Sequence, residues 1–578
     1  MKNISNNIGK FLMYVSLPLA GGLAGGLTSC DDINEFLEVK PLNEVVLDNY
    51  WTEKADVESV VYGCYSGLQS SDCLTRMFVW GDSRSDDVVY SKSGNNLNLQ
   101  QIIEENILET NPLLNWVSFY QVINRCNTVI YYAPIVAEKD PNYTDAEMRA
   151  NIAEATWIRS LCYFYLARTF RDVPYSTKPS MDDTNIDKDY RIEPTPFKTL
   201  LQSLASDLEA VKNDALRFYP PMRATDTKIS NPNNTSRVTV CSMNALLADI
   251  YLWLGEYQKC VDCTQKVFDY KLEIYQEVKE EKPSSVSDIK FMHGEKYPLI
   301  LEMTTGSSTA GNAYSQIFGQ GNTFESIFEL YFDADMSAST PVYGSYFYNS
   351  RDNGLCNAYS KQAEGVYTGA NKLFKYTDNR VCEYFDLTNQ NLVPITKFYY
   401  RRASFTPLKQ LASAPSVSYT SSNGYQNWIL YRLTDVMLMR AEALIELGSE
   451  DNMAEAFDLI AAVYNRANNL EEGDTKGLKQ EEYKDKKSMR ELVRDERHRE
   501  LMFEGKRWFD LVRYALLDGH NDDLVQKVTA KQTKNTNKVI IQLMRRDALF
   551  WPYAEREVDL NDKLHQNEAY LTTETSKK

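Results

Sequence analysis

Two widely separated stretches of the chain share a helix–glycine–helix pattern, and this pattern limits the possible folds most strongly. The first stretch runs from 248 to 270 with Gly255 at the break, and the second runs from 441 to 467 with Gly448 at the break. Glycine readily ends a helix, and the small residues before it let two helices cross closely. We therefore expect two helical hairpins that pack against neighbouring helices.

The pattern is similar to that of tetratricopeptide hairpins, which stack side by side and bury a continuous core. Because the two hairpins are not in tandem, we expect a scaffold of scattered repeats. Apolar periodicity predicts helices at four earlier places: 56–69, 113–132, 144–171 and 194–215. A capping box at Ser488 predicts a charged helix to Tyr514, with surface ion pairs worth about 0.3–0.5 kcal/mol each.

The material between the hairpins has a different composition. Residues 271–426 are rich in Ser, Gly, Asn, Thr and Tyr, with short strand-like runs at 299–301 and 326–330. Long loops on a rigid frame commonly carry binding surfaces. The predicted fold class is mainly α, a tetratricopeptide-like helical hairpin scaffold with an irregular loop-rich half containing a few short strands.

The N-terminus has the features of an export signal. It carries Lys2 and Lys10, then an uncharged stretch from Phe11 to Leu27, then Thr28-Ser29-Cys30. The sequence around Cys30 resembles a bacterial lipoprotein signal, which predicts cleavage before Cys30 and lipidation of its thiol. The alternative is a secretory signal that ends near a cysteine.

The acidic charge excludes one large class of partners. Removing residues 1–29 takes Lys2 and Lys10 from the 63 basic residues and nothing from the 80 acidic ones, which leaves a net charge of −19. Such a surface repels phosphate backbones, so we expect no nucleic-acid partner.

The remaining nine cysteines form a poor disulfide framework, because their number is odd and their spacing irregular. Cys260 and Cys263 have redox or zinc spacing but lie within a predicted helix, with no second pair and no nearby His. We expect these thiols to be small buried side chains.

Several stretches together resemble the SusD/RagB family of Bacteroidetes outer-membrane lipoproteins. The clearest runs from Arg494 to Arg513 and reads RDERHRELMFEGKRWFDLVR. The acidic pair Asp31-Asp32 after Cys30 is similar to the surface-export signal of that phylum. Further matching stretches lie in the family's order at 158–174, 236–239, 431–442, 549–553, 559–561 and 566–570.

The resemblance implies a lipoprotein anchored in the outer membrane and facing the cell exterior. Such a protein captures oligosaccharide or polysaccharide and delivers it to a SusC-like TonB-dependent transporter. The open alternatives are a peptide-binding member of the same family and a scaffold that binds protein partners without glycan. The resemblance implies no cofactor and leaves a structural Ca²⁺ open. Within the 494–513 stretch it implies Trp508 and Phe509 as core anchors and Arg507 and Asp510 as paired charges.

The expected organisation is a signal peptide over 1–29 and one SusD/RagB-like domain over 30–578. Within this domain we expect three parts: a helical scaffold over 45–270 and 427–515, a loop-rich insertion over 271–426, and a C-terminal tail over 516–578.

The first candidate ligand site follows the first helix, at 78–90. Trp80 or Tyr90 could stack on a sugar ring, because both present a flat apolar face with a polar edge. Neighbouring charged groups could take the sugar hydroxyls: Asp82, Arg84, Asp86 and Asp87. The alternative is that Trp80 packs inside and Arg84 bridges Asp86 or Asp87.

Two further candidate sites lie in the loop-rich half. One is the tyrosine-rich run with Tyr343, Tyr346 and Tyr348, where strand alternation places the last two on one face. Its alternative is a half-buried strand. The other is the 397–402 run with Tyr400, together with Arg380 upstream, where structural roles are an equal alternative.

The sequence favours binding over catalysis. It has no His-Glu-x-x-His, Gly-x-Ser-x-Gly or Walker motif, and its four His residues are isolated. A pair of glycosidase carboxylates is not excluded in a chain with 80 acidic residues. We therefore expect that the protein is not an enzyme. The composition of the loops specifies neither the sugar that is bound nor its linkage.

Overall fold

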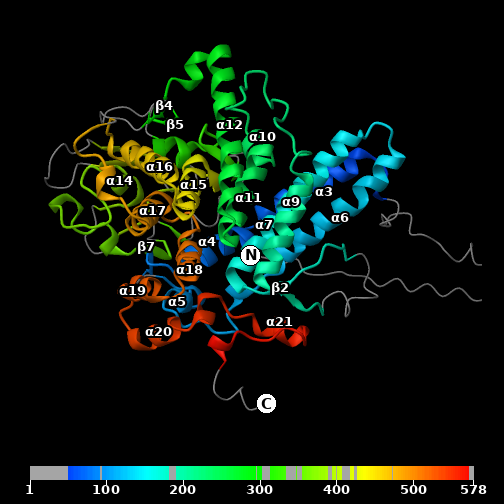
Figure 1. Ribbon diagram of the computed structural model, residues 1–578. Coiled ribbons are helices and arrows are strands. Elements are labelled where there is room, and N and C mark those ends of the chain that lie inside the picture. The colour runs from blue at the N-terminus through cyan, green and yellow to red at the C-terminus, as the bar shows by residue number, and fades with distance from the viewer. Residues whose placement is uncertain are drawn as a thin grey trace, which may run out of the picture. The chain divides into compact units, whose positions relative to one another are not determined.

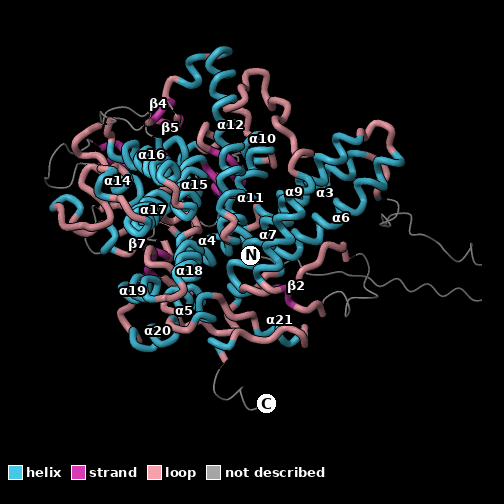
Figure 2. The backbone as a smooth tube through the Cα atoms, in the orientation of Figure 1, coloured by secondary structure: helices cyan, strands magenta, loops and turns pink. Residues whose placement is uncertain are grey.

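Helices dominate the structure, a computed structural model (Figures 1 and 2). The structure describes residues 50–91, 94–180, 191–293, 296–301, 313–332, 346–347, 354–387, 393–398, 400–405, 417–421, 426–471 and 473–571. Trp51–Lys578 is one compact unit, separate from Met1–Tyr50. The proposed lipid-bearing Cys30 lies outside the described residues.

The long helices pack against one another in a nearly continuous series. This arrangement confirms the mainly helical, tetratricopeptide-like fold class predicted from the sequence. In chain order the series is α3 (Lys54–Leu68), α6 (Val117–Lys139), α7 (Asp145–Phe170), α9 (Phe197–Val211), α11 (Val240–Leu254), α12 (Tyr257–Glu281), α15 (Leu433–Leu447), α16 (Glu450–Asn468) and α17 (Lys486–Leu501).

Both predicted hairpins are present. Gly255 and Gly448 adopt left-handed backbone conformations, with φ of 72° and 74°, and so end α11 and α15 before the next helix begins. The first hairpin differs from its prediction in length, because α12 continues past Tyr270 to Glu281. Ile274, Tyr275 and Val278 extend the buried stripe of α12, so the loop-rich half begins later than predicted.

The predicted single helix from Ser488 to Tyr514 is wrong. The chain instead forms α17 and α18 (Arg507–Asp518), with positive φ at Phe503 and Gly505 between them. The N-cap of α17 is Asp485, whose carboxylate accepts a hydrogen bond from the Ser488 backbone N–H at 2.9 Å.

Shorter helices complete the helical part: α4 (Ser71–Asp82), α5 (Leu97–Ile103), α10 (Asn233–Ser236), α14 (Arg380–Tyr384), α19 (Asp522–Ala530), α20 (Thr536–Leu543) and α21 (Glu555–Leu560). None of the described helices is both long and apolar enough to cross a bilayer.

The described strands form antiparallel pairs. In the loop-rich half, β6 (Ser326–Leu330) pairs with β10 (Trp428–Arg432), which leads directly into α15. This pairing attaches the loop-rich half to the scaffold. Strands occur at or beside both of the runs predicted from the sequence, 299–301 and 326–330. The other pairs are β1 (Val88–Tyr90) with β7 (Cys356–Ala358), β2 (Val173–Pro174) with β3 (Pro194–Thr195), β4 (Ile289–Met292) with β5 (Tyr297–Ile300), and β8 (Tyr400–Phe405) with β9 (Val417–Ser421).

The expectation for the cysteines is confirmed. All nine described thiols are buried and free of disulfides. Burial raises the pKa of Cys162 and Cys260 well above the usual thiol value, so these thiols stay protonated and inert.

Two glycines allow α4 to touch the turn between α17 and α18. A Cβ on Gly81 would lie 1.9 Å from the carbonyl oxygen of Gly505. The Gly505 N–H in turn donates to the Asp82 carboxylate at 2.7 Å. Backbone therefore packs directly on backbone at this crossing.

We predict that Gly81→Ala lowers the free energy of unfolding by about 3 kcal/mol or more, because backbone must move to admit the methyl group. Gly63→Ala in α3 is the matched control. Its Cβ would meet nothing within 4 Å, so the change should stabilise the helix by about 0.5–1 kcal/mol. Urea unfolding of both variants tests this, and equal stabilities would contradict the close approach.

Candidate functional site

Trp80 is a core residue in this structure and offers no stacking face. Its side chain is 0% exposed and its indole N–H donates to the Leu113 carbonyl at 2.9 Å. The rings of Phe119 and Phe170 pack against it at 5.0 and 5.2 Å. The alternative interpretation of this residue, interior packing, is the one the structure shows.

The charged residues after Trp80 are also buried, and their partners lie outside the 78–90 segment. Arg84 does not bridge Asp86 or Asp87. It pairs with Glu105 at 2.7 Å, and its guanidinium lies 4.0 Å from the centre of the Trp508 ring. Burial raises the pKa of Asp82 well above its usual value. These groups serve internal contacts and leave no surface for sugar hydroxyls.

Asp86, Asp87 and His498 form a buried cluster with the composition of a metal site. Both oxygens of Asp86, however, accept from Arg507 at 2.8 and 3.0 Å, so the predicted Arg507–Asp510 pair is wrong. Asp87 lies 2.5 Å from His498. Lys531 lies nearby, and burial lowers its pKa to about 8. Arg507 and Lys531 together can balance the two carboxylates, so charge neutrality does not require an ion here.

Arg380 belongs to a buried ion network centred on Glu500, which makes it unavailable to ligand. Arg380, Arg432 and Arg466 all reach the Glu500 carboxylate, at 3.0, 2.7 and 2.8 Å. Burial opposes ionisation of Glu500, but the three guanidiniums outweigh it and hold its pKa well below the usual range.

Other charges of the 494–513 stretch make similar tertiary pairs. Arg497 reaches Asp435 and Asp510, and Glu504 accepts from Lys397 and Arg432. The prediction of weak surface pairs along one helix was therefore wrong for these residues, because their partners lie on other elements. The predicted core anchors Trp508 and Phe509 are both buried, as expected.

The tyrosine candidates differ in accessibility. Tyr90 is partly exposed, and its hydroxyl accepts the Asn96 N–H at 2.6 Å. Tyr346 is buried edge-on against Phe78 at 5.5 Å between ring centres. Tyr343 and Tyr348 lie outside the described residues, as does the side chain of Tyr400 in β8. These last three stay predictions.

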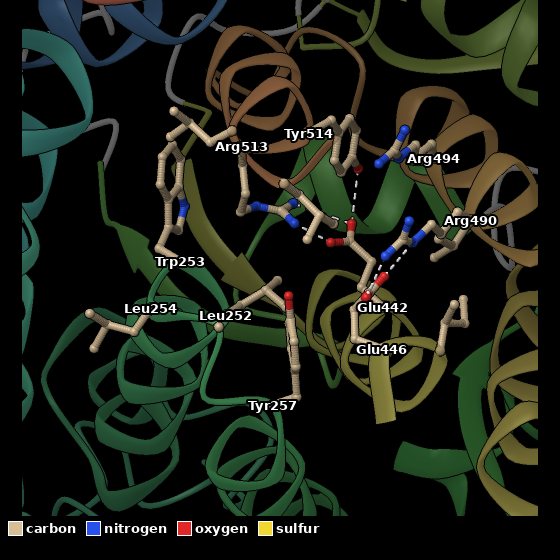
Figure 3. Close-up of a pocket in the computed structure, with 15 residues that line it drawn as sticks. Leu252, Trp253, Leu254, Tyr257, Glu442, Glu446, Arg490, Arg494, Arg513 and Tyr514 are labelled. Atoms are coloured by element: carbon tan, nitrogen blue, oxygen red, sulfur yellow. Dashed lines mark hydrogen bonds and ion pairs between the residues drawn. The ribbon is translucent and has the colours of Figure 1, made fainter. Parts of the chain in front are cut away.

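A cavity that the sequence did not suggest lies at the turn of the first hairpin (Figure 3). It has a volume of about 200 Å³ and is lined by residues of α11, α12, α15, α17 and α18. One wall is apolar and aromatic, and the other carries charged side chains. Its lining includes Trp253, Tyr257, Glu442, Glu446, Arg490, Arg494 and Arg513.

The arginines of this pocket are already paired with carboxylates. Arg490 makes two bonds of 2.6 Å to Glu446, and Arg494 makes bonds of 2.7 and 2.8 Å to Asp518. Arg513 pairs with Glu442. Because the opposite charges cancel locally, the pocket suits an uncharged polar ligand better than an ion.

Tyr257 gives this pocket a hydrogen-bonding group. In the part of the chain that the structure describes, its hydroxyl makes no hydrogen bond, and it points toward the charged wall (Figure 3). Burial raises the pKa of this hydroxyl, so it stays a donor at neutral pH. An aromatic wall beside fixed polar groups matches the chemistry of a sugar ring. The only hint in the sequence is that Trp253 and Tyr257 flank Gly255 within one hairpin turn.

Comparison with known proteins gives matches along most of the chain. Residues 324–570 match the SusD family, and residues 35–214 match a family described as starch-binding associating with outer membrane. A SusD-like protein of Formosa agariphila is 25% identical, over 99% of this chain and 100% of that protein.

Solved structures show the same fold. A SusD superfamily protein from Bacteroides thetaiotaomicron superposes with a TM-score of 0.62 at 19% identity, covering 90% of this chain and 99% of the other. A laminarin-binding SusD-like protein gives 0.60 at 18% identity, covering 90% and 100%.

The hairpins and the loop-rich half define a tetratricopeptide-like helical scaffold protein, with the fold of the SusD superfamily. With the family matches, this places the chain plainly in the SusD/RagB-like family.

We predict that Asp510→Asn lowers the free energy of unfolding by about 3 kcal/mol at pH 7, because it leaves Arg497 and Arg513 short of a buried partner. Burial disfavours the Asp510 charge, but the two arginines outweigh burial and lower its pKa from 3.8 to about 2. The stabilisation is thus present above about pH 4 and lost as the pH falls toward 2. Chemical unfolding at several pH values should show the difference from wild type narrowing over this range.

Asp72→Asn is the control for this measurement. The Asp72 side chain is 72% exposed, and the buried guanidinium of Arg76 beside it still donates to the backbone carbonyls of Asp72, Pro112 and Asn115. We therefore expect a change below about 1 kcal/mol at every pH. Equal effects of the two substitutions would contradict the role assigned to the buried network.

Proposed function

We propose that this protein is a cell-surface lipoprotein that captures oligosaccharide or polysaccharide and delivers it to a SusC-like TonB-dependent transporter. The observation that carries the proposal is the pair of family matches, over 35–214 and 324–570. A relative of the same fold is a laminarin-binding protein, which supports a glycan as cargo. The lipoprotein-like sequence at Cys30 supports an anchor in the outer membrane.

The chemistry of the pocket supports binding over hydrolysis. A glycosidase requires two carboxylates free to act as acid, base or nucleophile. Glu442 and Glu446 in the pocket are held by arginines instead. We place a sugar contact at this pocket, with Tyr257 as donor, and further contacts on the loop-rich half, where Tyr343, Tyr348 and Tyr400 are the candidates.

The test is retardation of the mature chain without its lipid, residues 31–578, in native gels that contain plant, host and microbial glycans. We expect one glycan to retard it and to be recovered unhydrolysed. Calorimetry with a casein digest covers the peptide-binding alternative. Binding to peptide but to no glycan would overturn the proposed cargo, and release of sugar fragments would show an enzyme.

We predict that Tyr257→Phe weakens binding of the retarding glycan about fivefold, because one hydrogen bond contributes about 1 kcal/mol. Tyr257→Ala should weaken it further by removing the ring. Tyr131→Ala is the control, since Tyr131 is an exposed tyrosine on α6 that does not line the pocket. If glycan affinity is the same in all three variants, the pocket is not a contact site, and the loop tyrosines become the next targets.

A further inference from the structure

A short helix near the C-terminus presents an apolar face to solvent. In α20, Val539 and Leu543 are buried and hold the helix on the molecule. The next face carries Ile540, Ile541 and Met544, which are 36%, 71% and 51% exposed. Residues three and four apart on a helix are neighbours, so these side chains form one continuous apolar patch.

Four exposed cations flank the residues of this patch in the sequence. The segment from Lys531 to Arg546 holds five basic residues and no acidic one, in a chain whose net charge is −17. Lys531 is buried, and its ammonium donates to the backbone carbonyls of Ser83 and Val88. The others are exposed: Lys534, Lys538, Arg545 and Arg546.

These four cations differ from the paired arginines of the interior. Among the described residues none of the four has a carboxylate within ion-pairing distance. Arg545 and Arg546 donate only to the backbone carbonyls of Glu568 and Gly519. A local positive surface therefore persists on an acidic protein.

We propose that this face of α20 docks on an anionic lipid surface. Apolar side chains flanked by long cationic ones are the composition of helices that lie in a membrane interface, where the apolar face enters the acyl boundary and the cations reach headgroup phosphates. The exposed cations precede and follow the apolar residues along the chain, which suits an extended anionic surface.

The inference rests on the outer-membrane location in the proposed function, because the anchor keeps the chain near headgroups. Twenty residues lie between Cys30 and Trp51, and a chain of this length spans about 70 Å at most, so an anchor at Cys30 would keep the folded unit within that distance of the headgroups. The helix face would then act as a second, reversible membrane contact beside the lipid.

The test is flotation of residues 31–578 with vesicles of equal parts phosphatidylglycerol and phosphatidylcholine, against vesicles of phosphatidylcholine alone. We expect flotation with the anionic vesicles, little with the neutral ones, and loss at high salt. Lys534→Ala and Lys538→Ala should each weaken partitioning about fivefold. Ile541→Ser should also weaken flotation with the anionic vesicles, because it removes part of the apolar face.

The matched control combines Lys266→Ala in α12 with Lys487→Ala in α17, two exposed lysines for which the structure shows no ion pair. This variant should float like the wild type. Absence of flotation, or equal flotation of the α20 and control variants, would overturn the proposal. A third outcome would also overturn it: the wild type does not float with vesicles, and an α20 variant no longer co-purifies with the transporter. The α20 face would then be a protein contact.

Glycan gels on the same variants separate the two proposals. We expect α20 substitutions to leave glycan retardation unchanged. If the wild type binds anionic vesicles but no glycan, the proposed cargo fails and the lipid contact holds.

Discussion

The convergence of three arginines on Glu500 is the interaction on which the rest of the structure depends. Arg380 comes from α14, Arg432 from the end of β10 and Arg466 from α16, while Glu500 itself lies in α17. Desolvating so many charges is costly, and apolar residues of similar volume often stabilise as well. What a charge cluster adds is a strong penalty for any arrangement that leaves one member without its partners. The network thus fixes how the loop-rich half sits on the helical scaffold.

This arrangement separates two tasks within one chain. The charges of the scaffold interior are satisfied by one another, which gives a rigid frame with little chemistry to offer a ligand. In the proposed function, recognition falls to polar groups that can still form a hydrogen bond, such as the Tyr257 hydroxyl beside the paired charges of the pocket. A frame of this kind can support many different loops, because the contacts that hold it together do not involve the ligand.

The sequence predicted local features of the fold well, because local signals determine them. Gly255 and Gly448 end their helices as expected, and the helix predicted from residue 144 begins there as α7, capped by Thr144 and Glu147. The break between α17 and α18 was missed because Phe503 adopts a positive φ that no sequence pattern indicates. Asp82 and Asp86 look like free sugar-binding groups in the sequence because their partners, Gly505 and Arg507, lie more than 400 residues away. The pocket was missed because its walls come from five helices that only the fold brings together.

Those long-range partners also determine when the protein can finish folding. Asp82 needs the Gly505 N–H, Asp86 needs Arg507, and Arg84 donates to the carbonyl of Ala548. The first hundred residues therefore cannot form all of their buried contacts until the last hundred residues are present. Contacts between such distant residues form slowly, and partly folded chains expose surfaces that aggregate. A protein held together by such long-range contacts gains from staying unfolded until the whole chain is available, and it tolerates loss of its C-terminal end poorly.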